Sequence, residues 1–177
     1  MQFVKLNKKM AVPSYTDAGY FSSYSINGKG IFFHKVDDID RNMLLSMVPE
    51  EYRGDFLVRL MKINASIPPH TDSYVKCGIN IYIEPGRCET RFYTKDESIE
   101  GERKTTQTTG RTFKESELTL AGSFIAEPGD VYLLDILQPH SVKNLDTVPV
   151  ERVVIVIQSE KHDFNAVLSM LKQTEWI

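Results

Sequence analysis

The sequence has little of what marks secreted, membrane-spanning or nucleic-acid-binding proteins. Its two cysteines, Cys77 and Cys88, are too few for a disulfide framework, and we expect both to be buried thiols. No apolar run approaches the length of a transmembrane helix, and the first residues lack the apolar segment of a signal peptide. The net charge of −3 gives no overall field that would attract a polyanion. These absences predict a cytoplasmic protein that binds no membrane. They disfavour nucleic acid as a partner, although a local basic patch and a nucleic-acid substrate stay open as alternatives.

What remains is the composition of an ordinary globular protein, with 41% apolar and 25% charged residues. A protein of 177 residues can bury one sizeable core, and we find no internal repeat and no linker. We therefore predict a single domain over residues 1–177. Within it we expect short strands and a helix as N-terminal support in 1–55, a core in 56–158 and a C-terminal helix in 160–177.

Strand-like segments dominate the predicted core. Apolar residues nearly alternate from Phe56 to Ile63, and we expect that strand to run on into Pro68-Pro69. In residues 77–83, Ile79, Ile81 and Ile83 fall on one face, with Asn80 and Tyr82 on the other. Further strands are expected at 90–93, 131–135 and 153–157. The pattern predicts a mainly β fold with flanking helices, of the double-sheet barrel or jelly-roll kind.

Two helices are expected beside this core. One follows Asp37 and Asp38, either of which can cap its first turn, and Pro49 ends it. The other begins after Asp163. The segment 95–116 is long and polar, so it is either a lid over a binding site or a solvated hairpin without a role.

Two short motifs carry side chains that bind metals. The first is Ile67-Pro68-Pro69-His70-Thr71-Asp72 and the second is Pro139-His140. In an extended strand His70 and Asp72 point to the same side, so both can reach one ion, with His140 arriving from a distant strand. Two histidines and one carboxylate form the facial set that leaves positions open on a non-haem Fe(II). The alternative is an ordinary surface pair and a core histidine. His34 and His162 have no such neighbours, and we interpret them as non-ligands.

Arg152 begins the apolar run that ends at Ile157. A guanidinium is costly to bury without an anionic partner, and it pairs with a carboxylate through two parallel hydrogen bonds. Either Arg152 pairs with Glu151 at the mouth of the strand, or it anchors a carboxylate-bearing co-substrate. The nearby metal motif favours the co-substrate.

Together, His70-Thr71-Asp72, His140 and the later Arg152 resemble the Fe(II)- and 2-oxoglutarate-dependent dioxygenase superfamily, whose fold is a double-stranded β-helix, a cupin-like barrel. The similarity covers about residues 58–158. The motifs are similar to those of the prolyl-hydroxylase-like branch and the aspartyl/asparaginyl hydroxylase-like group, including phage and bacterial members. They are Ile81-Tyr82-Ile83-Glu84, Cys88-Glu89-Thr90-Arg91-Phe92, Pro128-Gly129-Asp130-Val131 and Pro139-His140-Ser141-Val142-Lys143-Asn144.

The resemblance implies a role for each matching residue. His70, Asp72 and His140 would bind Fe(II), and Arg152 would hold the distal carboxylate of 2-oxoglutarate. Tyr82 would hydrogen-bond that carboxylate, with Asn80 on the same side of its strand; the alternative for Tyr82 is a core aromatic. Oxygen would be the second co-substrate, ascorbate a stimulant, and succinate and CO2 the products.

The resemblance also bears on the substrate. Relatives that halogenate have a small residue at the position of Asp72, so its carboxylate favours hydroxylation. Relatives that demethylate nucleic acids carry a second Arg where this protein has Gln158, so a protein side chain, prolyl or asparaginyl, is favoured over nucleic acid. A free amino acid or another small molecule stays open. The rival classes are a non-catalytic jelly-roll binding module and a cupin-type metal enzyme that needs no 2-oxoglutarate.

Overall fold

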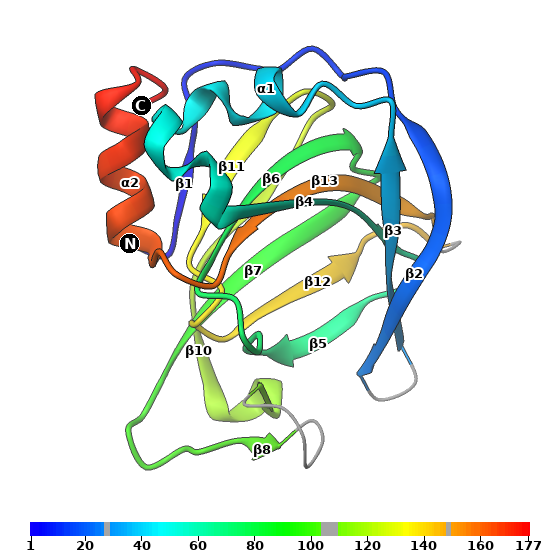
Figure 1. Ribbon diagram of the computed structural model, residues 1–177. Helices are drawn as coiled ribbons and strands as arrows, with labels where there is room; N and C mark the ends of the chain where they lie inside the picture. Colours follow the sequence, from blue (N-terminus) through cyan, green and yellow to red (C-terminus); the bar gives the residue numbers. More distant parts are fainter. Residues whose placement is uncertain (27–28, 104–109, 148–149) are drawn as a thin grey trace.

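The structure, a computed structural model, describes residues 1–26, 29–103, 110–147 and 150–177. It is mainly β, with 46% strand and 16% helix. Two antiparallel sheets face each other as a jelly roll (Figure 1), which confirms the predicted fold class. The strand order is β1-β11-β6-β13-β4-β3-β2 in the larger sheet and β10-β7-β12-β5-β9-β8 in the smaller. The division of the protein into support, core and C-terminal helix stays a prediction.

Seven strands form the larger sheet: β1 (Phe3–Lys5), β2 (Thr16–Ile26), β3 (Lys29–Asp37), β4 (Phe56–Ile63), β6 (Cys77–Glu84), β11 (Val131–Leu134) and β13 (Arg152–Ser159). Six form the smaller: β5 (Ile67–His70), β7 (Cys88–Lys95), β8 (Glu102–Arg103), β9 (Arg111–Thr112), β10 (Leu118–Ile125) and β12 (His140–Asn144). The helices are α1 (Arg41–Leu44), α2 (Phe164–Gln173) and the short 3-10 turns η1 (Leu45–Met47), η2 (Glu50–Asp55) and η3 (Glu115–Glu117).

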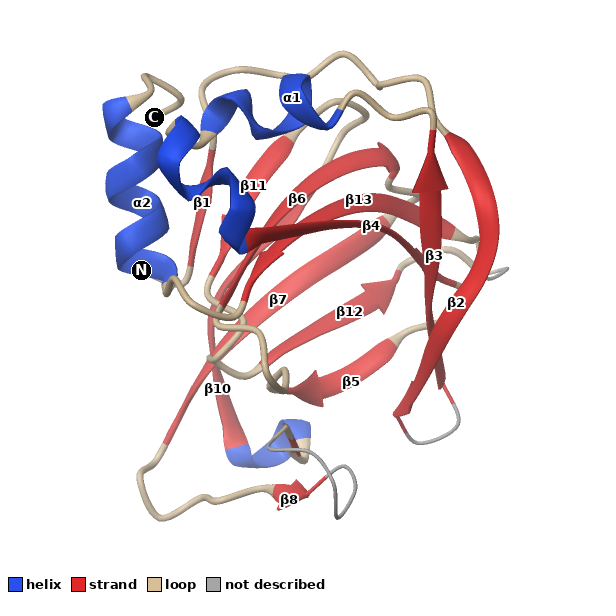
Figure 2. Cartoon of the chain, viewed as in Figure 1, coloured by secondary structure: helices blue, strands red, loops and turns tan. Residues whose placement is uncertain are grey.

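Helices α1 and α2, with the turns η1 and η2, cover the outer face of the larger sheet (Figure 2), so the molecule has three layers there. Strand β6 shows how the sequence builds them. Its Ile79 and Ile81 pack with Val167 and Leu171 of α2, whereas Tyr82 on the opposite face packs between the sheets with Phe92. The alternation predicted for this strand is confirmed, because successive side chains of a strand point to opposite faces. The helix cap at Asp163 is confirmed too: its carboxylate accepts from the backbone N–H of Ala166 at 2.9 Å.

The first helix begins later than predicted. Asp40, not Asp37 or Asp38, caps α1 by accepting from the backbone N–H of Met43 at 2.9 Å. Asp38 lies in the left-handed region with φ of 53° and accepts instead from the Thr16 hydroxyl. Three acidic residues in a short run offer the same capping chemistry, so the sequence alone does not choose among them.

The strand expected to run into Pro68-Pro69 is in fact two strands in different sheets. Strand β4 ends at Ile63 in the larger sheet, and the prolines lie in β5 of the smaller sheet. Strand β5 is short, and a proline has no N–H to donate to a sheet ladder, so its hydrogen bonding there is restricted. The crossing between β4 and β5 carries His70 to the sheet opposite Arg152.

The N-terminal third and the polar segment also differ from expectation. Strands β2 (16–26) and β3 (29–37) are long and pair with each other antiparallel, where short strands were expected. The polar segment 95–116 contains β8, β9 and η3, and its residues 104–109 lie outside the described residues. In the described ranges, no helix is both long and apolar enough to cross a membrane. The cytoplasmic location stays a prediction.

Gly129 allows the turn that leads into β11. Its φ of 82° lies in the left-handed region, and a Cβ there would come within 2.9 Å of the backbone oxygen of Met10. We expect Gly129→Ala to lower the free energy of unfolding by about 1–3 kcal/mol. Gly54→Ala is the control, because a Cβ at Gly54 would meet nothing within 4 Å. Urea unfolding of both variants checks this, and equal stability would contradict it.

A carboxylate joins three neighbouring strands at the edge of the larger sheet. Asp17 on β2 contacts His34 Nδ1 on β3 and Lys62 Nζ on β4, each at 2.8 Å. The hydrogen bond from Lys62 is the largest influence on the pKa of Asp17 and, with those from Gly19 and His34, lowers it to about 2, although burial opposes the shift. Because this pKa is depressed in the folded state, the stabilisation is complete above about pH 4 and is lost as the pH falls through 2.

We therefore expect Asp17→Asn to lower the free energy of unfolding by on the order of 1 kcal/mol near neutral pH. This difference should shrink steadily as the pH falls from 4 to 2. Urea midpoints of the wild type and the variant, measured at each pH, give this difference directly. A difference that stays constant down to pH 2 would show that the carboxylate charge does not contribute.

Candidate metal centre

The fold brings His70, Asp72 and His140 together. One ligand atom from each lies within 4.8 Å of the others, and this is the one such cluster of His, Cys, Asp or Glu among the described residues. His70 ends β5 and His140 begins β12, and the two are direct partners in the antiparallel register of these strands. Both imidazoles are buried, with ring centroids 4.3 Å apart, and the Asp72 side chain is partly exposed.

Each imidazole is held by the residue two positions before it. Nδ1 of His70 lies 2.9 Å from the carbonyl oxygen of Pro68, and Nδ1 of His140 lies 2.9 Å from that of Gln138. A carbonyl oxygen only accepts, so both Nδ1 atoms carry the proton and donate it. This tautomer leaves Nε2 as the coordinating nitrogen of each ring, which is the usual arrangement of metal-bound histidines.

The distances suit a small divalent cation. Nε2 of His70 lies 3.5 Å from Oδ1 of Asp72. Ligand bonds of roughly 2.0–2.2 Å at right angles would place neighbouring ligand atoms about 3 Å apart, so a small inward shift would close the set around an ion. Two imidazoles and one carboxylate on one face leave the opposite positions of the ion for other ligands. The residues present therefore fit a site for a divalent metal ion with open coordination positions.

Asp72 reaches the cluster by a different route from the one predicted. It does not share a strand with His70, because β5 ends at His70 and Asp72 lies in the following loop. Its backbone N–H donates to the Ile136 carbonyl at 3.1 Å. On the other side, Thr71 accepts from the Arg111 N–H at 3.0 Å and donates its own N–H to the Arg111 carbonyl at 2.9 Å. Strand β9, from the polar segment, therefore holds the loop that carries Asp72.

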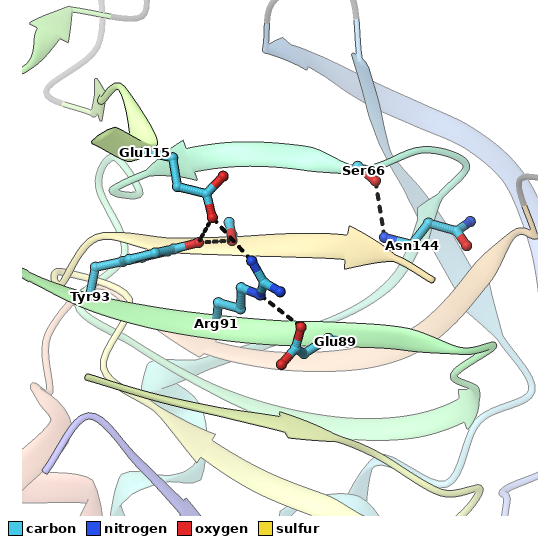
Figure 3. A network of polar contacts seen from close by, with 7 residues as sticks. Ser66, Glu89, Arg91, Tyr93, Glu115 and Asn144 are labelled. Carbon is cyan, nitrogen blue, oxygen red and sulfur yellow. Dashed lines mark hydrogen bonds and ion pairs between the residues drawn. The ribbon is translucent and has the colours of Figure 1, made fainter. Parts of the chain in front are cut away.

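A polar network fixes the outer face of the strands behind the cluster (Figure 3). The Tyr93 hydroxyl donates its proton to Glu115 at 3.1 Å and therefore accepts from the Ser141 hydroxyl at 2.9 Å. Arg91 donates to Glu115 at 3.1 Å and to Glu89 at 2.7 Å. Because Ser141 follows His140 in β12, this network anchors the ligand strand from the side away from the ion.

Arg152 is buried in the same cavity without an acidic partner. Its side chain is only 2% exposed, and Nη2 donates to the Tyr82 hydroxyl at 2.8 Å and to Thr90 Oγ1 at 3.0 Å. Nε and Nη1 are buried and have no hydrogen-bond partner, and no carboxylate of the described residues forms an ion pair with the guanidinium. The pairing with Glu151 considered above is therefore wrong. A buried, half-satisfied guanidinium is a ready site for a carboxylate.

The other two residues expected at the co-substrate site have different positions. Tyr82 is 1% exposed, holds Arg152 through its hydroxyl and packs in the core between the sheets. Asn80, on the same face of β6, lines the cavity. Both sit where the sequence placed them on the strand, and a contact of either with a co-substrate stays a prediction.

One cavity of about 480 Å³ contains the cluster and Arg152. It lies between the two sheets, and apolar side chains such as Ile67, Val142 and Ile136 form much of its wall. This volume falls within the roughly 300–1,000 Å³ of small-molecule sites. The arrangement can bind a divalent cation at three ligands and an anion at Arg152, inside one cavity.

Three further residues of this cavity escaped the sequence prediction as site residues. Thr90 accepts a hydrogen bond from Arg152 Nη2, and Arg59 and Glu160 line the opposite end of the cavity. Thr90 lies two residues before Phe92 in β7, so both side chains share the inward face. The period-two pattern of this strand could therefore have identified Thr90. Arg59 shares the inward face of β4 with Met61 and Ile63, so the same pattern could have found it. For Glu160 the sequence carries no such signal, because a loop that faces a cavity looks like one that faces solvent.

The remaining histidines and cysteines lie outside the cluster. His34 pairs with Asp17, and His162 pairs with Asp55 at 2.8 Å. That neither is a metal ligand stays a prediction. Both cysteines are free thiols and buried. Burial raises the pKa of Cys77, and burial also raises that of Cys88 although Arg152 opposes it, so neither is a reactive thiolate near neutral pH.

Comparisons with known proteins give no family for this protein. No protein-family model matches it, and no curated protein matches it. Among solved structures, the hydroquinone 1,2-dioxygenase PnpCD with bound Cd2+ has a TM-score of 0.40 at 12% identity and covers 59% of this chain and 58% of its own. Bacillus subtilis oxalate decarboxylase, described with Mn(II) centres, has a TM-score of 0.41 at 12% identity over 80% of this chain and 28% of its own.

The Cellulomonas parahominis L-ribose isomerase has a TM-score of 0.40 at 14% identity, over 84% of this chain and 73% of its own. The protein thus spans little more than half of the dioxygenase and about a quarter of the decarboxylase. Similarity at this level identifies neither a family nor an activity, so the chemistry must be argued from the site itself.

The cluster makes a direct prediction about metal binding. We expect His70→Ala and His140→Ala each to weaken Fe(II) binding by more than about a hundredfold, because loss of a ligand exceeds the 10–100-fold effect of losing an outer hydrogen-bond partner. His34→Ala, on strand β3 where the imidazole pairs with Asp17, is the matched control and should retain the metal. Anaerobic titration with Fe(II) measures the affinities, and unchanged iron binding by either ligand variant would refute the cluster.

Proposed function

We propose that this protein is an Fe(II)- and 2-oxoglutarate-dependent dioxygenase that hydroxylates an organic substrate. The observation that carries the proposal is the pairing of two features in one cavity: a His-Asp-His cluster and a buried guanidinium with two unpartnered nitrogens. An iron site alone would not need Arg152, and an anion site alone would not need three metal ligands. A co-substrate with a metal-chelating end and a distant carboxylate needs both.

His70, Asp72 and His140 would hold the iron, which when bound supplies the activation of O2. Arg152 would take the distal carboxylate of 2-oxoglutarate through Nε and Nη1, the two nitrogens that have no partner within the protein. Tyr82 and Thr90 keep Nη2 in place, so the guanidinium is oriented before the co-substrate arrives. The overall reaction converts 2-oxoglutarate, O2 and a substrate C–H group into succinate, CO2 and an alcohol.

The surrounding residues account for the control of water. The sheets enclose the cavity, and Ile67 and Val142 line it beside Thr90, close to the anion site. A low-polarity wall strengthens the attraction between the guanidinium and a carboxylate and excludes water that would compete for both. The segment that contains β9 stays a candidate lid, because it is hydrogen-bonded to the loop that bears Asp72.

A protein side chain remains the substrate that the sequence resemblance favours, with ascorbate as a stimulant. A cupin-type metal enzyme that uses no 2-oxoglutarate is the second candidate. The donor set is compatible with it, but it leaves the buried charge of Arg152 unexplained.

Substitution of Arg152 tests the proposal. We expect Arg152→Met to weaken 2-oxoglutarate binding to the Fe(II)-loaded protein at least about tenfold, since each hydrogen bond to a charged group contributes about 1.5–3 kcal/mol. The visible charge-transfer band of the anaerobic complex reports this binding. Iron affinity should not change, because Arg152 is not a ligand. Arg87→Met, which removes an exposed guanidinium that pairs with Asp146 at 3.5 Å, is the control and should bind 2-oxoglutarate normally.

The same variant separates this function from a structural one. A buried guanidinium without an ion pair destabilises a fold, so Arg152→Met should unfold at the same or a higher urea concentration than the wild type. A variant that lost stability but kept its affinity for 2-oxoglutarate would assign Arg152 a structural role. Wild-type protein that bound iron but neither bound 2-oxoglutarate nor formed succinate would favour the cupin-type enzyme.

A further inference from the structure

The cavity continues past the metal cluster to a second polar end. Arg152 and Gln158 stand at opposite ends of β13 and both line the cavity. Alternate residues of a strand face the same way, and at about 3.3 Å per residue the two lie roughly 20 Å apart. 2-Oxoglutarate held by Arg152 would fill only part of that length. Space remains at the end where Gln158 lies.

The metal cluster lies between the two ends. On one side, His140 is two positions along β12 from Val142. Val142 pairs with Thr90, which is a hydrogen-bond partner of Arg152. On the other side, Ile136 accepts from the backbone N–H of Asp72 and lies beside Gly78.

Gly78 is the β6 partner of Gln158 in the sheet. A molecule bound against Gln158 would therefore face the iron from the side opposite to the co-substrate.

The side chain of Gln158 has a buried acceptor without a hydrogen-bond partner. The residue is 8% exposed, and its Oε1 is buried with no hydrogen-bond partner. Leaving a buried acceptor unsatisfied costs about 1–3 kcal/mol. Its neighbours on the inward face of β13 are Val156 and Val154, and neither side chain can donate a hydrogen bond to the carboxamide. An N–H or O–H donor from a ligand would satisfy this oxygen.

Two opposite charges flank this acceptor. Arg59 on β4 pairs with Val156, which makes it the diagonal neighbour of Gln158 on the same face, at about 7–8 Å between Cα atoms. Its guanidinium stands 6.0 Å from the Phe33 ring. Glu160 follows the end of β13 and lines the cavity at its exposed mouth. A cation and an anion on either side of a buried acceptor complement a zwitterion.

Much of the wall between these charges and the metal cluster is apolar. Val75, Leu134, Ile136 and Val156 line it, and Asn80, the β6 partner of Val156, is a polar exception. An aliphatic group of a substrate would pack against this wall, close to the metal ligands. The polar groups of the same molecule would then reach the end of the cavity that Glu160 lines. This division between an aliphatic part and a zwitterionic part is that of a free α-amino acid.

We propose that this end of the cavity binds an aliphatic α-amino acid, and we base this on the function proposed above. The ammonium group donates to Gln158 Oε1 and to Glu160, the carboxylate pairs with Arg59, and the aliphatic group lies along Val75 and Ile136. One atom of O2 then enters succinate as 2-oxoglutarate loses CO2. The other enters an aliphatic C–H bond of the amino acid, whose hydrogen stays as the new hydroxyl proton. The four electrons that O2 needs come in equal parts from 2-oxoglutarate and from that C–H bond.

Anaerobic calorimetry tests this binding without any turnover. The probes are L-valine, L-leucine, L-isoleucine and L-methionine, each titrated into protein that carries Fe(II) and 2-oxoglutarate, and also into protein that carries Fe(II) alone. We expect saturable binding of at least one probe. In air, the same probe should increase succinate formation.

Gln158→Met removes the acceptor while keeping the length of the side chain. We expect it to raise the dissociation constant of the probe about tenfold, the effect of one hydrogen bond, while the dissociation constant of 2-oxoglutarate changes less than twofold. Gln173→Met makes the same chemical change at the end of α2 and should bind the probe as the wild type does. Urea midpoints confirm that both variants fold.

The N-acetyl amides of the same amino acids distinguish a free amino acid from a residue within a polypeptide, because they keep the aliphatic group and lose both charges. We expect them not to bind. Binding of the capped probes alone would overturn the proposal in favour of a peptide substrate. Failure of every free probe, in protein that binds 2-oxoglutarate and forms succinate, would overturn it and leave the dioxygenase function standing. Failure to bind 2-oxoglutarate would instead count against that function, with probe binding still measurable.

Discussion

The register between β5 and β12 is the constraint on which the rest of the site depends. It sets His70 directly opposite His140, and a slip of one residue would turn one of the two imidazoles to the outer face of the sheet. Two features support this register. Strand β9 pairs with β5 on its far side, and the Tyr93–Ser141–Glu115 network holds the back of β12. The metal ligands are thus placed by sheet geometry, which tolerates little local freedom.

Much of this can be predicted from the sequence, because period-two patterns report which face of a strand is buried. The faces of β6, the buried strand β13 and the cap at Asp163 all follow from local rules. The cluster itself is predictable, but the route of Asp72 is not: it comes from a loop held by Ile136 and Arg111, and contacts between distant segments leave no local trace. The choice of Asp40 over its acidic neighbours is hidden for a different reason, since all three have the same chemistry.

Arg152 shows how burial changes the meaning of a residue. On the sequence it is a charge at the start of a strand with a glutamate beside it. In the fold it is turned inward, away from Glu151, and satisfied at one nitrogen only. Gln158, at the other end of the same strand, is also buried and incompletely bonded. Strand β13 therefore presents two incompletely hydrogen-bonded side chains to a single cavity, and apolar residues separate them.

Both histidines follow a proline, and each donates Nδ1–H to the carbonyl of the residue before that proline. The partner that orients each ring therefore travels with it in a tripeptide, Pro68-Pro69-His70 in one strand and Gln138-Pro139-His140 in the other. In many metal sites that partner is a distant carboxylate, which must be preserved separately. Here mutation elsewhere in the barrel can reshape the cavity without releasing either imidazole. Substitutions at the substrate end of the cavity can therefore change what binds there while the orientation of both imidazoles is kept.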